Sequence, residues 1–258
     1  MSKIIYNGAV TPSMSILANA NIDSSTSNLV NYNRPVNTFV MIATSSTAAA
    51  YSTNGITWTA TTLPSSAQWQ TVTYGNSTFV AVAYSSTTAA AYSTNGITWT
   101  TTTMPSTSSW YSVTYGNNTF VAVAGGSSGT TTAAYSTNGI TWTTTTMPST
   151  SSWYSVTYGN NTFVAVATNT PFGTTAAAYS TNGITWTTTT MPSSANWYSV
   201  TYGNGTFAAV AGGFGGTPTA AYSTNGITWT ATTLPSNNIW RAITSGAPTE
   251  SARLLQTL

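Results

Sequence analysis

The sequence has almost no charged residues. Of 258 residues, four are Lys or Arg and two are Asp or Glu, and none lies between Arg34 and Arg241. Soluble domains ordinarily have about a quarter of their residues charged, and nucleic-acid binding draws much of its affinity from Lys and Arg side chains that neutralise phosphates. The body of this chain has no basic face, so we expect no binding to nucleic acid.

Cysteine and histidine are absent. The chain therefore has no disulfide, no thiolate or imidazole ligand for a metal, and no base for Ser-His-Asp catalysis. Its two acidic residues, Asp23 and Glu250, lie near opposite ends of the sequence, whereas glycoside hydrolysis normally needs two carboxyl groups about 5–10 Å apart. We expect a protein that is not an enzyme and that uses no metal or cofactor.

Long apolar runs are also missing. No segment approaches the ~20 apolar residues of a membrane span, and Asn, Gly, Pro and Ser interrupt the apolar residues of segment 1–20, where a signal peptide would need a continuous core. The aromatic content of 12% argues against disorder, because such a chain can bury a core. We expect a soluble protein made in the cytoplasm, or one released by a route that needs no cleaved N-terminal signal, without membrane insertion.

What the sequence does contain is one unit present five times. The segment YSTNGITWT begins at residues 51, 92, 135, 179 and 222, and a second tryptophan follows each motif tryptophan by eleven residues, which accounts for all ten tryptophans. A fixed period of this size indicates repeats that bury their apolar faces against one another. We expect the tryptophans to be core residues, with sugar stacking as the alternative for some of them.

Each unit is expected to form four antiparallel strands. WYSVTYG and TFVAVA have the alternation and length of strands, and Asn117-Asn118 between them suits the positive φ of a tight hairpin. The third strand, AAYST, meets the fourth, ITWTTTT, at Asn-Gly, which predicts a type I′ turn. The fourth strand is expected to stop at Met104-Pro105, because proline cannot donate to a ladder. Four such strands make a blade.

The fold class predicted is all-β: a five-bladed β-propeller of four-stranded antiparallel blades over residues 37–246. Segment 240–246, WRAITSG, matches a first strand but has no second strand after it, whereas TFVMIAT, before the first motif, lacks a first strand. The two deficits complement each other, so we expect the C-terminal strand to complete the first blade and close the ring. The alternative is that Leu29–Arg34 is a degenerate first strand.

The motif has relatives in known families. STNGITW resembles the Asp-box, S-x-D-x-G-x-T-W, of sialidase-type (BNR) propeller repeats, with a shortened spacing and Asn in place of Asp in all five copies. The longer pattern, W-x-x-V-x-YGN-x-TFVAVA followed by YSTNGITWT, looks like repeats of bacteriophage tail-fibre and virion-surface proteins. Asp-boxes in such families are turn elements away from the catalytic centre, so the resemblance implies architecture and a virion setting rather than glycosidase activity.

The differences between the copies indicate where a ligand would bind. Length varies only in the loop between the second and third strands, which we expect at the same end of the blades as the residue after each first-strand tryptophan. Aromatic rings with hydroxyl and amide neighbours suit neutral sugars, although surface loops also vary simply because they tolerate insertions. The candidate ligand-binding residues at these two positions are Tyr84, Phe172, Phe214, Tyr111, Tyr154, Tyr198 and Arg241.

The function expected is a non-enzymatic virion structural or host-contact protein, tail- or capsid-associated, anchored through segments 1–36 and 247–258. Its partners would be other virion subunits in a larger assembly, together with a host-surface glycan, and its location the virion or otherwise the extracellular space. The alternatives are a lectin-like carbohydrate-binding propeller and a self-assembling surface or sheath protein. The candidate assembly residues are Lys3, Ile4, Ile5, Tyr6, Arg34 and Arg253.

Overall fold

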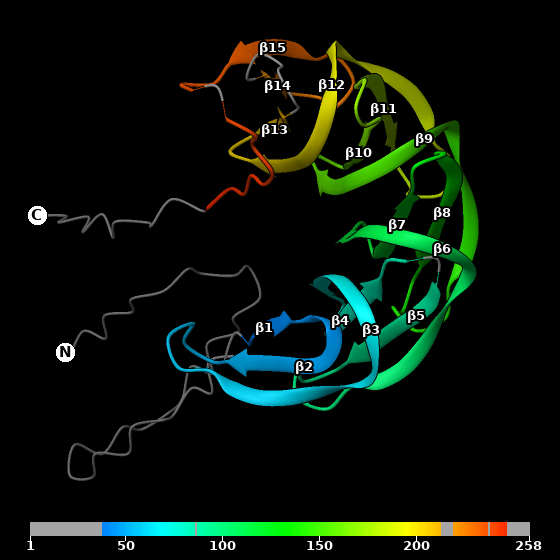
Figure 1. Ribbon diagram of the computed structural model, residues 1–258, viewed down its shortest axis with the longest axis vertical. Helices are drawn as coiled ribbons and strands as arrows, with labels where there is room; N and C mark the ends of the chain where they lie inside the picture. Colours follow the sequence, from blue (N-terminus) through cyan, green and yellow to red (C-terminus); the bar gives the residue numbers. More distant parts are fainter. Residues whose placement is uncertain (1–37, 86, 213–218, 237, 247–258) are drawn as a thin grey trace, which may run out of the picture. The chain divides into compact units, whose positions relative to one another are not determined.

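The computed structural model describes residues 38–85, 87–212, 219–236 and 238–246, which contain fifteen strands and no helix. The strands pair antiparallel with their neighbours in sequence order, from β1 to β15 (Figure 1). No described helix is therefore available to cross a membrane. The strands are β1 Phe39–Ile42, β2 Thr44–Ser52, β3 Thr59–Gly75, β4 Thr78–Ala83, β5 Thr87–Ser93, β6 Thr100–Gly116, β7 Thr119–Gly125, β8 Thr130–Ser136, β9 Thr143–Gly159, β10 Thr162–Thr168, β11 Thr174–Ser180, β12 Thr187–Gly203, β13 Thr206–Gly212, β14 Thr219–Ser223 and β15 Thr230–Thr233.

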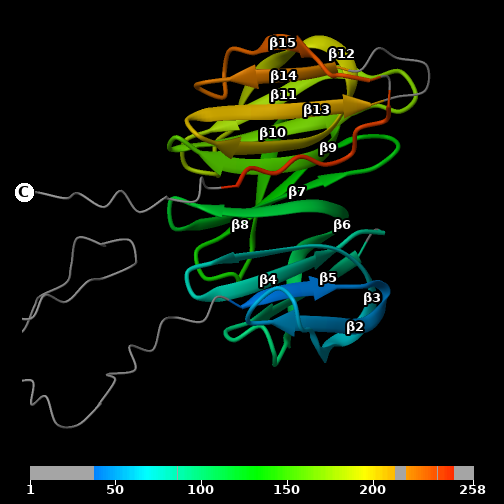
Figure 2. The ribbon, with the colours of Figure 1, turned by 90° about the vertical axis from the view of Figure 1, so that its left-hand side faces the viewer.

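Four long strands divide the described chain into successive groups. β3, β6, β9 and β12 have 17 residues each, and each pairs through its first half with the preceding strand and through its second half with the following one. We name the groups A to E in chain order (Figure 2). Group A contains β1, β2 and the first half of β3. Groups B, C and D each run from the second half of one long strand to the first half of the next. Group E contains the second half of β12 together with β13, β14 and β15.

The long strands correct one expectation, that strands end at the prolines. β6 continues through Met104-Pro105 as one strand. Thr103 pairs with Ala89 and Ser108 with Thr87, with a register shift between the two pairs. The proline thus lies at an irregularity where the strand passes from group B to group C, and there its missing N–H interrupts no ladder.

The first turn of each unit is the tight hairpin that the sequence predicts. Asn117 and Asn118 both have positive φ, 45° and 56°, and the equivalent pairs in the other copies do the same. Two consecutive positive φ values match the twist of the flanking strands. This prediction is confirmed.

The Asn-Gly turn has a different construction, and the type I′ prediction is wrong there. Gly96 has φ 73°, but Asn95 does not have positive φ. Instead, the Asn95 side-chain oxygen accepts hydrogen bonds from the backbone N–H groups of Ile97 and Thr98 at 2.8 and 2.9 Å, and Ser93 Oγ accepts one from Gly96 at 2.8 Å. All five copies repeat these bonds. Side chains, rather than a two-residue backbone turn, therefore hold this connection.

The core lies between successive groups. At the boundary of groups B and C, Val80 and Val82 of one group pack with Trp110 and Phe120 of the next, and all four are fully buried. The other boundaries repeat this arrangement. The core assignment of the tryptophans is confirmed for Trp69, Trp99, Trp110, Trp142, Trp153, Trp186, Trp197 and Trp229. The exceptions are in the outermost copies, where Trp58 is 40% exposed and Trp240 is half-buried.

Hydrogen bonds between side chains and backbone groups reinforce the boundaries. Between groups C and D, the N–H of Val156 donates to Ser112 Oγ at 3.1 Å and Asn117 Nδ2 donates to the Thr181 carbonyl at 3.3 Å. At the same boundary the ring of Tyr158 occupies the space where a Cβ on Gly116 would lie. Glycine is required at this point of the strand because the next group's aromatic ring takes the place of its side chain.

The sheet is not closed in the described residues. β1 and β15 are the terminal strands of the order and have one neighbour each. Segment 240–246, predicted as the closing strand, is not a strand, but it contacts β12 as a first strand would. The N–H of Ile243 donates to Ser199 Oγ at 3.3 Å, and Ser245 Oγ donates to the Tyr202 carbonyl at 2.6 Å. The alternative closing segment, Leu29–Arg34, lies outside the described residues.

The described residues belong to one compact unit, Asn37–Ala247. The two segments expected to anchor the protein, 1–36 and 247–258, lie outside the described residues. So do all the candidate assembly residues, namely Lys3, Ile4, Ile5, Tyr6, Arg34 and Arg253.

Candidate binding site

The position after each first-strand tryptophan is a β-bulge. In β6, Trp110 pairs with Ala124 and Ser112 with Val123, so Tyr111 is the extra residue between two paired ones. Gln70, Tyr154 and Tyr198 hold the same place in β3, β9 and β12. A bulge bends its strand and redirects the extra side chain, so the tryptophan packs in the core while its neighbour is free to face elsewhere.

These redirected side chains meet across the group boundaries. The ring centroids of Tyr111 and Tyr154 are 4.8 Å apart with an interplanar angle of 26°, and those of Tyr154 and Tyr198 are 5.3 Å apart at 77°. Tyr84, from the loop after β4, stacks on Tyr111 at 6.0 Å. At the other end, the guanidinium carbon of Arg241 lies 4.1 Å from the Tyr198 ring centroid. We call the series Tyr84, Tyr111, Tyr154, Tyr198 and Arg241 the aromatic row.

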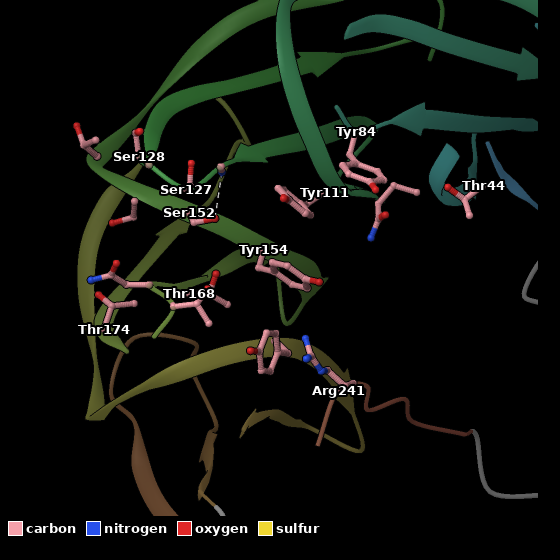
Figure 3. A pocket seen from close by; sticks show the side chains of 18 residues that line it. Thr44, Tyr84, Tyr111, Ser127, Ser128, Ser152, Tyr154, Thr168, Thr174 and Arg241 are labelled. Atoms are coloured by element: carbon pink, nitrogen blue, oxygen red, sulfur yellow. Dashed lines mark hydrogen bonds between the residues drawn. The ribbon is translucent and has the colours of Figure 1, made fainter. Parts of the chain in front are cut away.

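The aromatic row lines a cavity of about 820 Å³ (Figure 3). The rest of the lining comes from Thr44, Gln70, segment 126–129, strand residues 150–152 and segment 168–170, together with Thr174. Segment 126–129 and residues 169–170 belong to the connections between second and third strands, the loops that vary between copies, and Thr168 is the last residue of β10. The expectation that these loops and the residues after the tryptophans share one end of the molecule is confirmed.

Backbone and side-chain hydrogen bonds hold the cavity wall. Ser152 Oγ accepts from the N–H of Gly126 at 3.1 Å, which ties the loop of group C to the strand that enters group D (Figure 3). Asn196 Oδ1 accepts from the N–H of Asn169 at 2.9 Å in the next copy. The variable loops are therefore anchored to the long strands at their bases.

The structure brings together five of the seven candidate ligand-binding residues, which are the members of the aromatic row. Phe172 is 83% exposed and does not line the cavity, and Phe214 lies outside the described residues. The sequence did not identify the lining residues Thr44, Ser127 and Ser152. Their only signal was membership of the variable loop or of the segment just before a first-strand tryptophan.

The packing of the row changes the chemistry expected of it. Tyr111 stacks against both Tyr84 and Tyr154, so these rings use much of their face area on each other. Less ring face is left as a platform for a sugar than the sequence suggested. The cavity side chains are otherwise hydroxyls and amides, and none of the lining residues is aliphatic.

Arg241 is the sole charged residue among those described, and no described carboxylate can neutralise it. Burial raises the pKa of Tyr111 above its usual 10.0, and the neighbouring Tyr154 and Tyr84 raise it further. The Tyr111 phenol is thus a neutral hydrogen-bonding group near physiological pH. Within the described part of the chain, no cluster of His, Cys, Asp or Glu could hold a metal ion.

Antiparallel meanders joined in series and packed against one another through an aromatic core define a repeat protein of the β-propeller kind. Solved structures agree. The chain is similar to the structure of YCF48 bound to D1 peptide (TM-score 0.51, 13% identity, 72% of this chain and 61% of that one). It is also similar to YCF48 from Cyanidioschyzon merolae (TM-score 0.51, 16% identity, 74% and 68%) and to a chain of a nidogen/laminin complex (TM-score 0.56, 10% identity, 81% and 82%).

These likenesses show the fold alone, and the chain spans less than two thirds of the YCF48 chain in the peptide complex. No protein-family model and no curated protein matches the sequence. The resemblance to Asp-box and bacteriophage repeats therefore rests on the motifs themselves.

Proposed function

We propose that this protein is a non-catalytic, saccharide-binding β-propeller, and that its ligand binds in the cavity beside the aromatic row. The observation that carries the proposal is the convergence of Tyr111, Tyr154 and Tyr198 with the loops that differ between copies. Ligand cavities are usually lined mainly by apolar side chains. A lining of phenol, hydroxyl and amide groups suits a ligand that is itself rich in hydroxyls.

A peptide is the main competing ligand, because one similar structure is of YCF48 bound to D1 peptide. An apolar peptide side chain would require an apolar subsite, and none of the lining residues has an aliphatic side chain. Catalysis is not part of the proposal. Asp, Glu, His and Cys are absent from the lining, so it supplies no pair of groups for acid and base steps.

A saccharide-binding propeller would also serve the role of host contact on a virion, which the motif resemblance over residues 37–246 suggests. In that setting the ligand is a host-surface glycan and the protein acts outside the producing cell. Anchoring would then fall to segments 1–36 and 247–258. The lectin-like activity is the more direct proposal, because it depends on the described cavity.

The binding proposal is tested with the full chain on an array of neutral and acidic oligosaccharides, followed by calorimetry on the best binder. Replacement of the central ring, Tyr154→Ala, is expected to weaken binding at least about tenfold, because it removes contacts to both neighbours and to the ligand. Phe172→Ala, an exposed aromatic outside the cavity, is the matched control. Absence of saccharide binding by the native protein, or equal binding by Tyr154→Ala, contradicts the proposal.

We further propose that groups A to E are five blades, and that segment 240–246 completes group A and closes the ring. Group A has Phe39, Met41 and Trp58 where group C has Phe120, Ala122 and Trp142. In group A these side chains are 48, 46 and 40% exposed. Their equivalents in group C are 0, 0 and 8% exposed. Group A therefore lacks the cover that its counterpart receives from the preceding group.

The opposite end of the chain contains the complementary residues. Val210 and Ala220 of group E occupy the positions of Val82 and Ala90 of group B, and Trp240 and Ile243 occupy those of Trp110 and Val113. A fifth boundary between groups E and A would bury these residues with the exposed face of group A. Substitution of Gly246, which has no neighbour in the open form, tests this closure.

A further inference from the structure

Arg241 breaks the equivalence of the repeats at the place where they line the cavity. Arg241 follows the first-strand tryptophan of its copy. The preceding copies have Gln70, Tyr111, Tyr154 and Tyr198 at this position. The four other side chains are neutral, whereas Arg241 carries the only charge among the described residues. The cavity is therefore neutral along most of its wall and cationic at one end of the aromatic row.

The Arg241 side chain is exposed, and its guanidinium lies over one aromatic ring. Its central carbon lies 4.1 Å from the ring centroid of Tyr198, a cation–π distance that orients the group. A guanidinium has five N–H donors in a planar fork that matches a carboxylate with two parallel hydrogen bonds. The described residues contain no acidic side chain to occupy that fork.

We infer that the cavity binds an acidic saccharide, with the carboxylate of a uronic acid on Arg241 and the neutral part of the chain along the tyrosines. This inference rests on the proposed saccharide binding and specifies its ligand class. The hydroxyl, phenol and amide groups of the lining pair with sugar hydroxyls, and the single cation selects one negative charge. Since only one end is cationic, the ligand binds in a single orientation.

The probe is a trisaccharide of two neutral hexoses and one terminal glucuronic acid, compared with its methyl ester, which is neutral, by calorimetry on the full chain at low salt. The native protein is expected to bind the acid at least about tenfold more tightly than the ester, the scale of one charge-assisted hydrogen-bond pair. Arg241→Gln should reduce this ratio to about one. Arg241→Lys should give an intermediate ratio, because a lysine has the charge without the planar fork.

Phe172→Ala is the control and should leave the ratio unchanged. If the acid and the ester bind equally to the native protein, the inference fails while saccharide binding stands; if neither binds, nor any other oligosaccharide, the proposed function fails with it. A trisaccharide of three neutral hexoses that carries one terminal sulfate instead of a carboxylate would overturn the carboxylate assignment if it bound as tightly as the acid. The inference would also be overturned if the Glu250→Gln variant preferred the acid and the native protein did not, because Arg241 would then be neutralised within the native chain.

Discussion

At the scale of the residue, an asparagine occupies the same position of the turn in all five copies of the repeat. The Asn138 side-chain oxygen accepts hydrogen bonds from the N–H groups of Ile140 and Thr141, both at 2.8 Å. The turn requires only an acceptor oxygen, which an amide supplies as well as a carboxylate does. The neutral choice avoids five like charges in equivalent turns, which would repel one another.

Tyr111 predicts an alkaline limit to stability. Its pKa in the folded protein is raised above 10.0 by burial and by Tyr154 and Tyr84, so the folded state binds this proton more tightly than the unfolded state does. The contribution of Tyr111 to the free energy of unfolding is fully present below about pH 10 and is lost as the pH rises through the raised pKa.

The measurement is the urea midpoint between pH 7 and pH 11 for the native protein and for Tyr111→Phe. We expect a smaller alkaline decline in the variant, because phenylalanine cannot ionise. Tyr51→Phe, at a tyrosine outside the cavity lining, is the control. Identical declines in the native protein and in Tyr111→Phe would show that this phenol does not govern the alkaline limit.

At the scale of the element, the long strand is the unit that connects structure with site. One 17-residue strand, such as β9 from Thr143 to Gly159, closes one group, opens the next, buries Trp153 and presents Tyr154 at its bulge. The core and the cavity wall are therefore adjacent positions of the same strand. A change that displaces this strand should affect stability and ligand binding together.

Gly116→Ala is expected to destabilise the protein by about 1–3 kcal/mol, because its methyl group would overlap the Tyr158 ring of the next group. The free energy of unfolding from urea titration measures the loss. In a double-mutant cycle, Tyr158→Ala should remove most of the cost of Gly116→Ala. If the cost persists in that background, the ring is not its cause.

At the scale of the whole molecule, the central question is whether the two ends of the strand order meet. At three boundaries, an aromatic ring covers the glycine that ends the previous first strand: Tyr115 covers Gly75, Tyr158 covers Gly116 and Tyr202 covers Gly159, whereas Ser245 takes this place at Gly203. Two residues are left over. Tyr74 is 57% exposed, and Gly246 has nothing within 4 Å of where its Cβ would lie.

Gly246→Ala distinguishes the closed from the open form. If the propeller closes, the side chain of Tyr74 covers Gly246. The substitution should then lower the free energy of unfolding by about 1–3 kcal/mol, as at Gly116. In the open form the new methyl group meets nothing and the urea midpoint stays unchanged. A loss that Tyr74→Ala relieves supports five closed blades, whereas an unchanged midpoint argues against closure.

The sequence by itself determined the repeat, the all-β class, the core tryptophans and the first hairpin turn. These depend on local spacing, alternation and turn chemistry, which recur in each copy. It also indicated the cavity end, because Tyr111, Tyr154 and Tyr198 share one position and the variable loops another. Local rules failed at Met104-Pro105 and at the Asn-Gly turn, where a strand shared by two groups and a side-chain acceptor decided the geometry.

Only the tertiary structure decided how these pieces combine. The bulge that redirects Tyr111 depends on its pairing with β7, and the stacking of Tyr111 on Tyr154 depends on contact between successive groups. Neither is visible in a single copy of the repeat. The same holds for Arg241, whose lone charge is plain in the sequence but whose place over Tyr198, at one end of a neutral cavity, follows from the packing of segment 240–246 beside β12.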